Sequence, residues 1–254
     1  MPTADLYKKI FSRENINLKE RVLNNSSLSK EEAGRIWEKY FWFTPLKLQL
    51  PLKKYCLDKK KVLDVGSAWG EFLIHFGPDS KGVEVNGKET KFSRSLSLNV
   101  EQYNIEDEWR EVKNSFDAVW ASNVLEHVIA PHSVLRNFHK TLKPGGLLFV
   151  RVPTIPSNLF FIFLNKIFLG FLGYKAAQHI NAFTRRALEF TIERAGFEIL
   201  ESNVFIPPIG WLNFLLNLVL KDALSFITVV ARKTEFSYSE KRPPAHNPNW
   251  IKNQ

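Results

Sequence analysis

The chain is poor in cysteine. Cys56 is the only one among 254 residues, which excludes an internal disulfide and fits a reducing compartment without requiring one. The first residues, Met1 to Leu6, lack the apolar stretch of a secretory signal peptide. No uninterrupted apolar run reaches the roughly 20 residues that a transmembrane helix needs. We therefore expect a cytoplasmic protein, with a peripheral position at the inner face of a membrane as the open alternative.

What the sequence does contain is apolar and basic. Hydrophobic residues make up 44% of the chain and include 21 phenylalanines, enough for a sizeable core. Lysine and arginine outnumber aspartate and glutamate by 35 to 26, which gives a net charge of +9. Such a surplus suits nucleic acid, a phosphorylated substrate or an anionic membrane surface as partner. The basic residues are scattered, however, with one run at Lys59-Lys60-Lys61, and this distribution is typical of an ordinary solvated surface.

The sequence KVLDVGSAWGEFLIHF has the pattern of a nucleotide-binding unit. Residues 62–65 predict a buried strand, Gly66 and Gly70 predict a tight turn, and residues 71–76 predict the start of a helix. Glycine allows a sharp bend and close approach of a ligand, and a helix N-terminus offers free N–H groups. Asp64, at the end of the strand, can accept hydrogen bonds from an ammonium group or from the turn.

The spacing of the small residues indicates which nucleotide is bound. Gly66, Ala68 and Gly70 do not match the G-x-G-x-x-G fingerprint of dinucleotide-binding proteins, which disfavours a NAD-dependent dehydrogenase. The turn resembles the D-x-G-x-G-x-G turn of class I S-adenosylmethionine (SAM) methyltransferases, with alanine in place of the middle glycine. This resemblance implies SAM as the cofactor, with Asp64, Gly66, Ser67, Ala68 and Gly70 among the residues that bind it.

Other residues complete the predicted cofactor site. Glu84, in a second predicted strand, follows the turn by roughly the 20 residues expected of an acid that binds a ribose diol. The resemblance also implies that Ile105 stacks on the adenine and that Glu106 accepts from its amino group, and it includes Ser122 among the cofactor-binding residues. A plain acidic loop is the alternative for Ile105 and Glu106.

Two further motifs resemble the same family. The segment FDAVWASNVLEHV, beginning at Phe116, is similar to the FD-x-V and LEH-V signature of small-molecule methyltransferases, and LKPGG, beginning at Leu142, resembles the turn before the next strand. With a later AGF, the motifs cover about residues 60–233. They imply an α/β fold: a Rossmann-like, seven-stranded, mostly parallel sheet with helices on both faces, an antiparallel last strand and an N-terminal helical cap.

The chain divides into three predicted parts. Residues 1–58 form the N-terminal helical cap, in which Ser29 opens a capping box and an aromatic cluster around Trp37 either packs on the domain or lines the substrate pocket. Residues 59–233 form the SAM-binding methyltransferase domain. Residues 234–254 are polar, contain three prolines and predict a flexible tail.

Two apolar insertions, near residues 155–180 and 206–222, exceed what such a fold needs. Both should leave the sheet at the carboxyl ends of its strands, where open α/β sheets bind ligands. They pack on each other and on the cap, or face a membrane or lipid-linked substrate, or form an oligomer interface. The oligomeric state stays open.

Methyl transfer to oxygen can need a base. His127 and His179 are the candidate catalytic residues, because imidazole titrates near neutral pH. Their alternative role is structural, as hydrogen-bonding partners beside the cofactor. One subgroup of quinone O-methyltransferases has E-x-x-E-H here and is thought to hold a metal. Asn123 replaces the first glutamate, so we predict no metal site, although Glu126 and His127 match.

The predicted function is SAM-dependent methyl transfer to an oxygen of a small-molecule or lipid-linked glycan acceptor. The alternatives are a quinone or isoprenoid methyltransferase and a non-catalytic SAM-binding module. Nucleic acid is not expected as a partner. The segment SNVL, beginning at Ser122, lacks the [N/D]-P-P-[Y/F] turn of amino-methylating enzymes, and Cys56, which precedes the cofactor fold, is misplaced for a cytosine-methylating nucleophile.

Overall fold

The computed structural model describes residues 13–41, 44–153, 179–205 and 226–235. By its internal contacts the chain divides into two compact units. The first unit is residues 1–108 with 116–120, and the second unit is residues 109–115 with 121–254. Except for four residues (179, 180, 234 and 235), the predicted insertions and the predicted tail lie outside the described residues.

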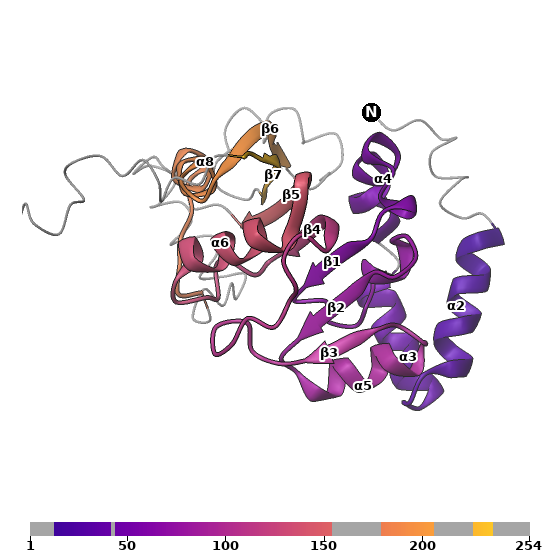
Figure 1. Ribbon diagram of the computed structural model, residues 1–254. Helices are drawn as coiled ribbons and strands as arrows, with labels where there is room; N and C mark the ends of the chain where they lie inside the picture. Colours follow the sequence, from indigo (N-terminus) through magenta and orange to yellow (C-terminus); the bar gives the residue numbers. More distant parts are fainter. Residues whose placement is uncertain (1–12, 42–43, 154–178, 206–225, 236–254) are drawn as a thin grey trace, which may run out of the picture. The chain divides into compact units, whose positions relative to one another are not determined.

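Seven strands of the described chain form one mixed sheet in the order β3-β2-β1-β4-β5-β7-β6 (Figure 1). They are β1 (Val62–Val65), β2 (Lys81–Glu84), β3 (Val100–Gln102), β4 (Phe116–Ser122), β5 (Leu142–Pro153), β6 (Phe197–Phe205) and β7 (Phe226–Lys233). β2 pairs in parallel with β1 and β3. β7 is antiparallel to both β5 and β6, so β6 runs in the direction of β5. The predicted seven-stranded, mostly parallel sheet with an antiparallel last strand is confirmed.

The central strands form where apolar runs can be buried on both faces. All four residues of β1 are buried, as are most of those in β4. Continuous burial of this kind favours residues without polar side chains. Asp64 is the exception in β1, with only 1% of its surface exposed. Because a buried carboxylate is costly unless it is partnered, this residue indicates a role other than packing.

The described helices begin with the predicted N-terminal group. They are α2 (Arg13–Asn25), α3 (Lys30–Ile36), a π-helical turn (Trp37–Phe41), α4 (Thr44–Tyr55), a 3-10 turn (Leu57–Lys59), α5 (Gly87–Ser95), α6 (Pro131–Thr141) and α8 (Arg185–Arg194). Ser29 caps α3 as predicted, because its side chain accepts from the backbone N–H of Glu32 at 3.2 Å. Among the described helices, none combines the length and the apolar character needed to cross a bilayer.

The aromatic cluster of the N-terminal helices packs into the core of the first unit. Trp37 and Phe41 are 5% and 1% exposed, and their rings stack with centroids 5.8 Å apart. Phe41 also meets Phe92 of α5, whose ring lies edge-on to that of Trp69 at 5.2 Å. Tyr40 contacts Trp69 as well. These helices are thereby packed against the glycine turn itself, which contains Trp69.

The prediction of a helix directly after the glycine turn is wrong. Only a single 3-10 turn, Leu73–His75, forms there. The next residues are Gly77, whose N–H donates to the carbonyl of Leu57 at 3.0 Å, and Pro78, which has no N–H to donate. The chain is therefore diverted before a helix can grow, and backbone groups of the turn replace the expected helix N-terminus.

β5 includes the LKPGG segment, which the sequence predicted as a turn before the strand. The strand begins at Leu142, but its pairing with β7 starts only at Leu147. Gly145 has a positive φ of 70°, which fits the turn chemistry of this segment.

Candidate functional site

The glycine turn of the first unit has three residues with positive φ. These are Gly66 (68°), Ala68 (44°) and Gly70 (80°). Gly66 and Ser67 both donate their backbone N–H to the carbonyl of Val83 in β2, at 2.8 and 3.1 Å. Ala68 adopts the left-handed region that an L-residue with a Cβ normally avoids, which is a strain characteristic of functional turns.

Glu84 holds this strained turn in place. One of its carboxylate oxygens accepts the backbone N–H of Ala68 and the other accepts that of Asn86, both at 2.9 Å. The side chain is 7% exposed. Each oxygen has a second lone pair, so the carboxylate can still accept hydroxyl donors from a ligand. The predicted ribose-binding acid therefore also builds the turn, which the sequence did not reveal.

Four carboxylates gather around the turn. Burial and the charges of Glu71 and Glu84 raise the pKa of Asp64 well above its usual range, although the Leu73 backbone amide opposes this. Burial, followed by the charge of Glu84, raises the pKa of Glu89 to about 7. Glu71 and Glu89 were missed in the sequence, where Glu71 belongs to the expected helix start and Glu89 is an ordinary acid in a polar stretch. Such a crowd of acids favours a cationic ligand.

Buried polar atoms without partners also mark the turn. In the described part of the chain, Asp64 Oδ2, Ser67 Oγ and Trp69 Nε1 are buried and lack a hydrogen-bond partner. Unsatisfied buried groups are rare in native proteins and call for a ligand or water. They offer one anionic acceptor, one hydroxyl and one donor, a set that fits the sulfonium, ammonium and carboxylate groups of SAM. Gly70 keeps the turn close-packed, since an added Cβ would lie 2.4 Å from Leu98.

The remaining predicted cofactor residues are less tightly placed. Ile105 is half-buried in the first unit, and Glu106 is exposed, with its backbone N–H donated to Asn104 Oδ1 at 3.1 Å. Ser122 is the half-buried last residue of β4 and belongs to the second unit. Their contacts with an adenine or with SAM stay predictions.

His127 and His179 come together in the second unit, although 51 residues separate them in the sequence. Their ring centroids are 4.9 Å apart, in an edge-to-face arrangement. The backbone N–H groups of Ile180 and Asn181 both donate to the carbonyl of Glu126, at 2.8 and 3.0 Å. The Asn181 side chain adds bonds to two further carbonyls of the same loop, those of residues 125 and 128. We call these bonds the histidine latch.

Glu126 directly precedes His127 in the sequence, and its carboxylate lies close to both histidine rings. It is 1% exposed, and neither carboxylate oxygen has a hydrogen-bond partner within the described residues. Burial raises the pKa of Glu126 to about 7, against the opposing effects of its own backbone N–H and the charge of Arg151. Burial and the neighbouring His127 lower the pKa of His179.

Glu126, His127 and His179 could hold a metal ion. Their ligand atoms all lie within 4.8 Å of one another. Two imidazoles and one carboxylate suit a divalent transition metal, and an unpartnered buried carboxylate fits the same purpose. The absence of a metal site was predicted because Asn123 replaces a glutamate. The latch brings in His179 as a third donor, which local spacing could not indicate.

Curated relatives of the chain share a methyltransferase name. A ubiquinone biosynthesis O-methyltransferase from Pseudomonas aeruginosa is 29% identical over 145 residues, which cover 50% of this chain and 62% of the relative. One from Chromobacterium violaceum is 33% identical over 132 residues, covering 46% and 57%. The matches therefore span less than two thirds of these relatives.

Solved structures share the fold. A SAM-dependent methyltransferase from Mesorhizobium loti has a TM-score of 0.54 at 19% identity, covering 70% of this chain and 92% of that one. One from Archaeoglobus fulgidus has a TM-score of 0.56 at 19% identity, covering 79% and 99%. A [4+2]-cyclase also matches, with a TM-score of 0.53 at 16% identity and coverage of 92% and 97%. The fold alone therefore does not determine the reaction.

A match to a protein-family model shows which family the chain belongs to. Residues 36–202 match the family described as Methyltransferase domain. This range is more than half of the chain and includes the glycine turn, Glu84 and both histidines. The chain therefore belongs to this methyltransferase-domain family.

Proposed function

We propose that this protein transfers the methyl group of SAM to an oxygen atom of a small-molecule acceptor. The observation that carries the proposal is the pairing of His127 with His179, two groups able to take a proton from a hydroxyl. The O-methyltransferase names of the relatives support the choice of oxygen. Asp64, Gly66, Ser67, Ala68, Gly70 and Glu84 are the proposed cofactor contacts in the first unit, with Ile105, Glu106 and Ser122 as further candidates.

The reaction balances without another reactant. The acceptor oxygen attacks the methyl carbon, a C–O bond forms, and the C–S bond breaks. The electron pair of the broken bond neutralises the sulfonium and leaves S-adenosylhomocysteine. The hydroxyl proton passes to the base, for which His127 and His179 are the proposed residues. The protein contributes mainly alignment of the reactants and exclusion of water.

The acceptor is best sought first among phenolic or quinol rings. The curated relatives are named for ubiquinone biosynthesis, which favours this alternative over a lipid-linked glycan. The glycan and peripheral membrane predictions depend on the apolar insertions, which lie outside the described residues apart from residues 179 and 180. A cytoplasmic location and a membrane contact therefore stay proposals, as does the absence of nucleic acid among the partners.

The test is a transfer assay with methyl-labelled SAM and catechol, followed by the same assay with a catechol that carries an isoprenoid chain. We expect a labelled methyl ether and an equal amount of S-adenosylhomocysteine. SAM binding with no transfer to any hydroxylated acceptor would contradict the proposal and favour the non-catalytic module. Preference for the isoprenoid compound would support an apolar acceptor site.

The histidines could instead hold a metal ion together with Glu126. A bound divalent cation would supply a Lewis acid for an acceptor oxygen. A ring nitrogen that binds a metal cannot also take a proton, so the two roles separate. Metal content by mass spectrometry should fall in His127→Asn and His179→Asn if these residues are ligands. If they act as a base, transfer is lost in the variants while chelator treatment leaves the unsubstituted protein active.

A further inference from the structure

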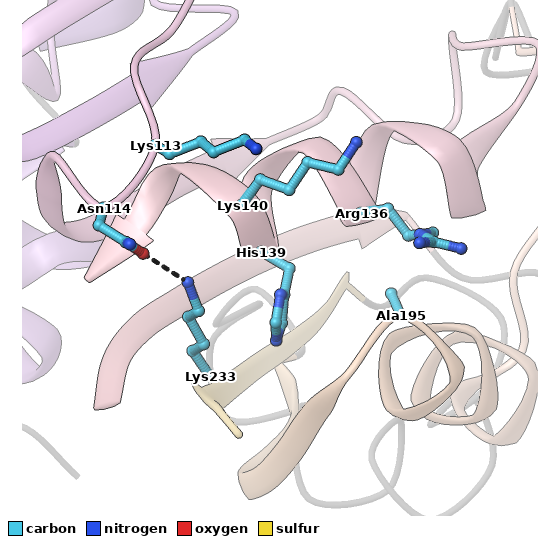
Figure 2. A pocket seen from close by; sticks show the side chains of 7 residues that line it. All are labelled: Lys113, Asn114, Arg136, His139, Lys140, Ala195 and Lys233. Carbon is cyan, nitrogen blue, oxygen red and sulfur yellow. Dashed lines mark hydrogen bonds between the residues drawn. The ribbon is translucent and has the colours of Figure 1, made fainter. Parts of the chain in front are cut away.

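A basic cavity of about 260 Å³ lies in the second unit, and its lining includes none of the candidate cofactor or catalytic residues. Its lining includes Lys113 and Asn114 before β4, Arg136, His139 and Lys140 on α6, and Lys233 at the end of β7 (Figure 2). These segments meet where β4 and β5 begin. Because this lining shares no residue with the candidate site, the proposed methyl transfer does not account for the cavity.

Hydrogen bonds fix the walls of the cavity. Lys233 Nζ donates to Asn114 Oδ1 at 2.9 Å, the bond drawn in Figure 2, and to the carbonyl of Leu142 at 2.6 Å. His139 Nε2 lies 3.1 Å from the carbonyl of Thr234, so this nitrogen is the donor. The backbone N–H of Asn114 donates to the carbonyl of Lys140 at 3.0 Å. Lys233 and His139 are thus held by hydrogen bonds to neighbouring segments. Two of the three N–H groups of the Lys233 ammonium are used by the bonds above, and within the described residues the third can serve a ligand.

Positive charge dominates this cavity. Lys113, Arg136, Lys140 and Lys233 each bring a cationic group, and no carboxylate is among the described residues that line it. No ion pair joins Lys113, Arg136 or Lys140 to an acid in the described part of the chain. The C-terminal ends of α6 and α8 lie at this cavity. Each contributes about half a negative charge, so together they offset only about one of the four positive charges.

Two residues that line the cavity have lowered pKa values. Burial lowers the pKa of Lys233. Burial also lowers the pKa of His139, and the charges of Lys233 and Arg136 lower it further, against hydrogen bonds to the carbonyls of Thr234 and Gly196. For His139, part of this lowering of the pKa comes from neighbouring positive charge, which an anion in the cavity would offset.

We propose that this cavity, which we call the anion pocket, binds the phosphate group of a phosphorylated small molecule. Lysine and arginine donors at close quarters are the usual partners of a phosphate group. The cavity is smaller than the sites that hold drug-sized ligands, about 300–1,000 Å³, so it suits a phosphate group with a short substituent rather than a nucleotide. The proposal is independent of the acceptor proposed above.

The experiment is a calorimetric titration of the full-length protein with inorganic phosphate and with glycerol 3-phosphate at constant ionic strength. We expect saturable binding of both, weakened about tenfold or more in Lys113→Gln/Lys140→Gln. Both lysines are exposed, so this variant should fold normally. Its SAM binding should be unchanged, which separates failure of the pocket from failure of the methyltransferase proposal.

The matched control is Lys30→Gln/Lys91→Gln, which removes the same charge from two exposed lysines elsewhere. Phosphate binding that persists equally in both double variants would overturn the proposal, as would no binding of any phosphate probe to the unsubstituted protein. Phosphatidic acid vesicles, compared with phosphatidylcholine vesicles, distinguish the source of the group. Vesicle binding that needs Lys113 and Lys140 would support the pocket and assign it to a lipid headgroup.

Discussion

The glycine turn of the first unit and the anion pocket of the second unit carry opposite charge within one basic protein. Around the turn, burial and neighbouring carboxylates raise the pKa of Asp64 and of Glu89, and Asp64 Oδ2 has no hydrogen-bond partner within the described residues. In the anion pocket, burial and then the charges of Lys233 and Arg136 lower the pKa of His139, and Lys233 itself is half-buried. The net charge of +9 therefore predicts the electrostatics of neither region. The charge of a bound ligand is complemented by the groups around its site rather than by the net charge of the protein.

Removing the backbone freedom of the turn should have the largest effect. Gly70 and Gly145 both have positive φ, of 80° and 70°, but an added Cβ meets Leu98 at 2.4 Å only at Gly70, and at Gly145 it meets nothing within 4 Å. We expect Gly145→Ala to cost about 1 kcal/mol in the free energy of unfolding from its backbone conformation alone. Gly70→Ala should cost about 2 kcal/mol, because the half-buried Leu98 side chain must also turn aside, and SAM binding should be lost. Chemical denaturation and calorimetry measure both. Equal costs would show that crowding at Gly70 is unimportant.

Neutralising one acid of the turn should have the second-largest effect. Glu84→Gln leaves one acceptor oxygen for two backbone donors, those of Ala68 and Asn86. We expect SAM affinity to fall by about 2 kcal/mol, or about thirtyfold. Glu31→Gln, at an exposed residue of α3, is the control and should leave SAM affinity unchanged. Phosphate binding should not change in either variant, and a change in Glu84→Gln would mean that the two regions are coupled.

Proton linkage should produce a smaller effect. The pKa of Glu89 is raised to about 7, and a cationic ligand favours ionised carboxylates. SAM binding should therefore lower this pKa and release protons, so that affinity rises with pH, by at most about tenfold per unit for one coupled proton. Calorimetry in buffers of different ionisation enthalpy counts the protons. The slope should flatten in Glu89→Gln, and affinity that falls as pH rises would contradict this assignment.

Salt should give the smallest difference. The lysines at 113 and 140 are exposed and screened by ions, whereas Asp64 and Glu84 are buried. We expect phosphate affinity to fall several-fold between about 0.05 and 0.5 M potassium chloride, with SAM affinity nearly constant. An equal salt dependence for both ligands would remove the distinction between an open and a buried electrostatic site.

Local sequence patterns predicted the parts of the fold that local physics determines. The apolar run at residues 62–65 became β1, and Ser29 capped its helix. The helix after the turn failed because Gly77 and Pro78 divert the chain, although both residues were visible. Tertiary contacts decided the rest: His179 reaches His127 only through the latch, and Lys233 meets Asn114 across 118 intervening residues.

The candidate cofactor site also combines residues that local sequence predicts with residues that only tertiary contacts bring in. The strand-turn motif and the later acid identified Asp64 and Glu84 because their spacing follows the chain. Glu71 and Glu89 gave no such signal, since an acid at an expected helix start or in a polar stretch is usually solvated. Their effect depends on burial beside other carboxylates, which only the fold produces.

The histidine latch has a consequence for how such a protein can diversify. β5 fixes the chain up to Pro153 by its pairing with Phe226, and the latch fixes it again from His179. Both attachment points are independent of the identity of the 25 residues between them. Sequence changes confined to residues 154–178 should therefore leave the pairing of β5 with β7 and the bonds of the histidine latch unchanged, so this stretch can diversify without displacing His127 and His179.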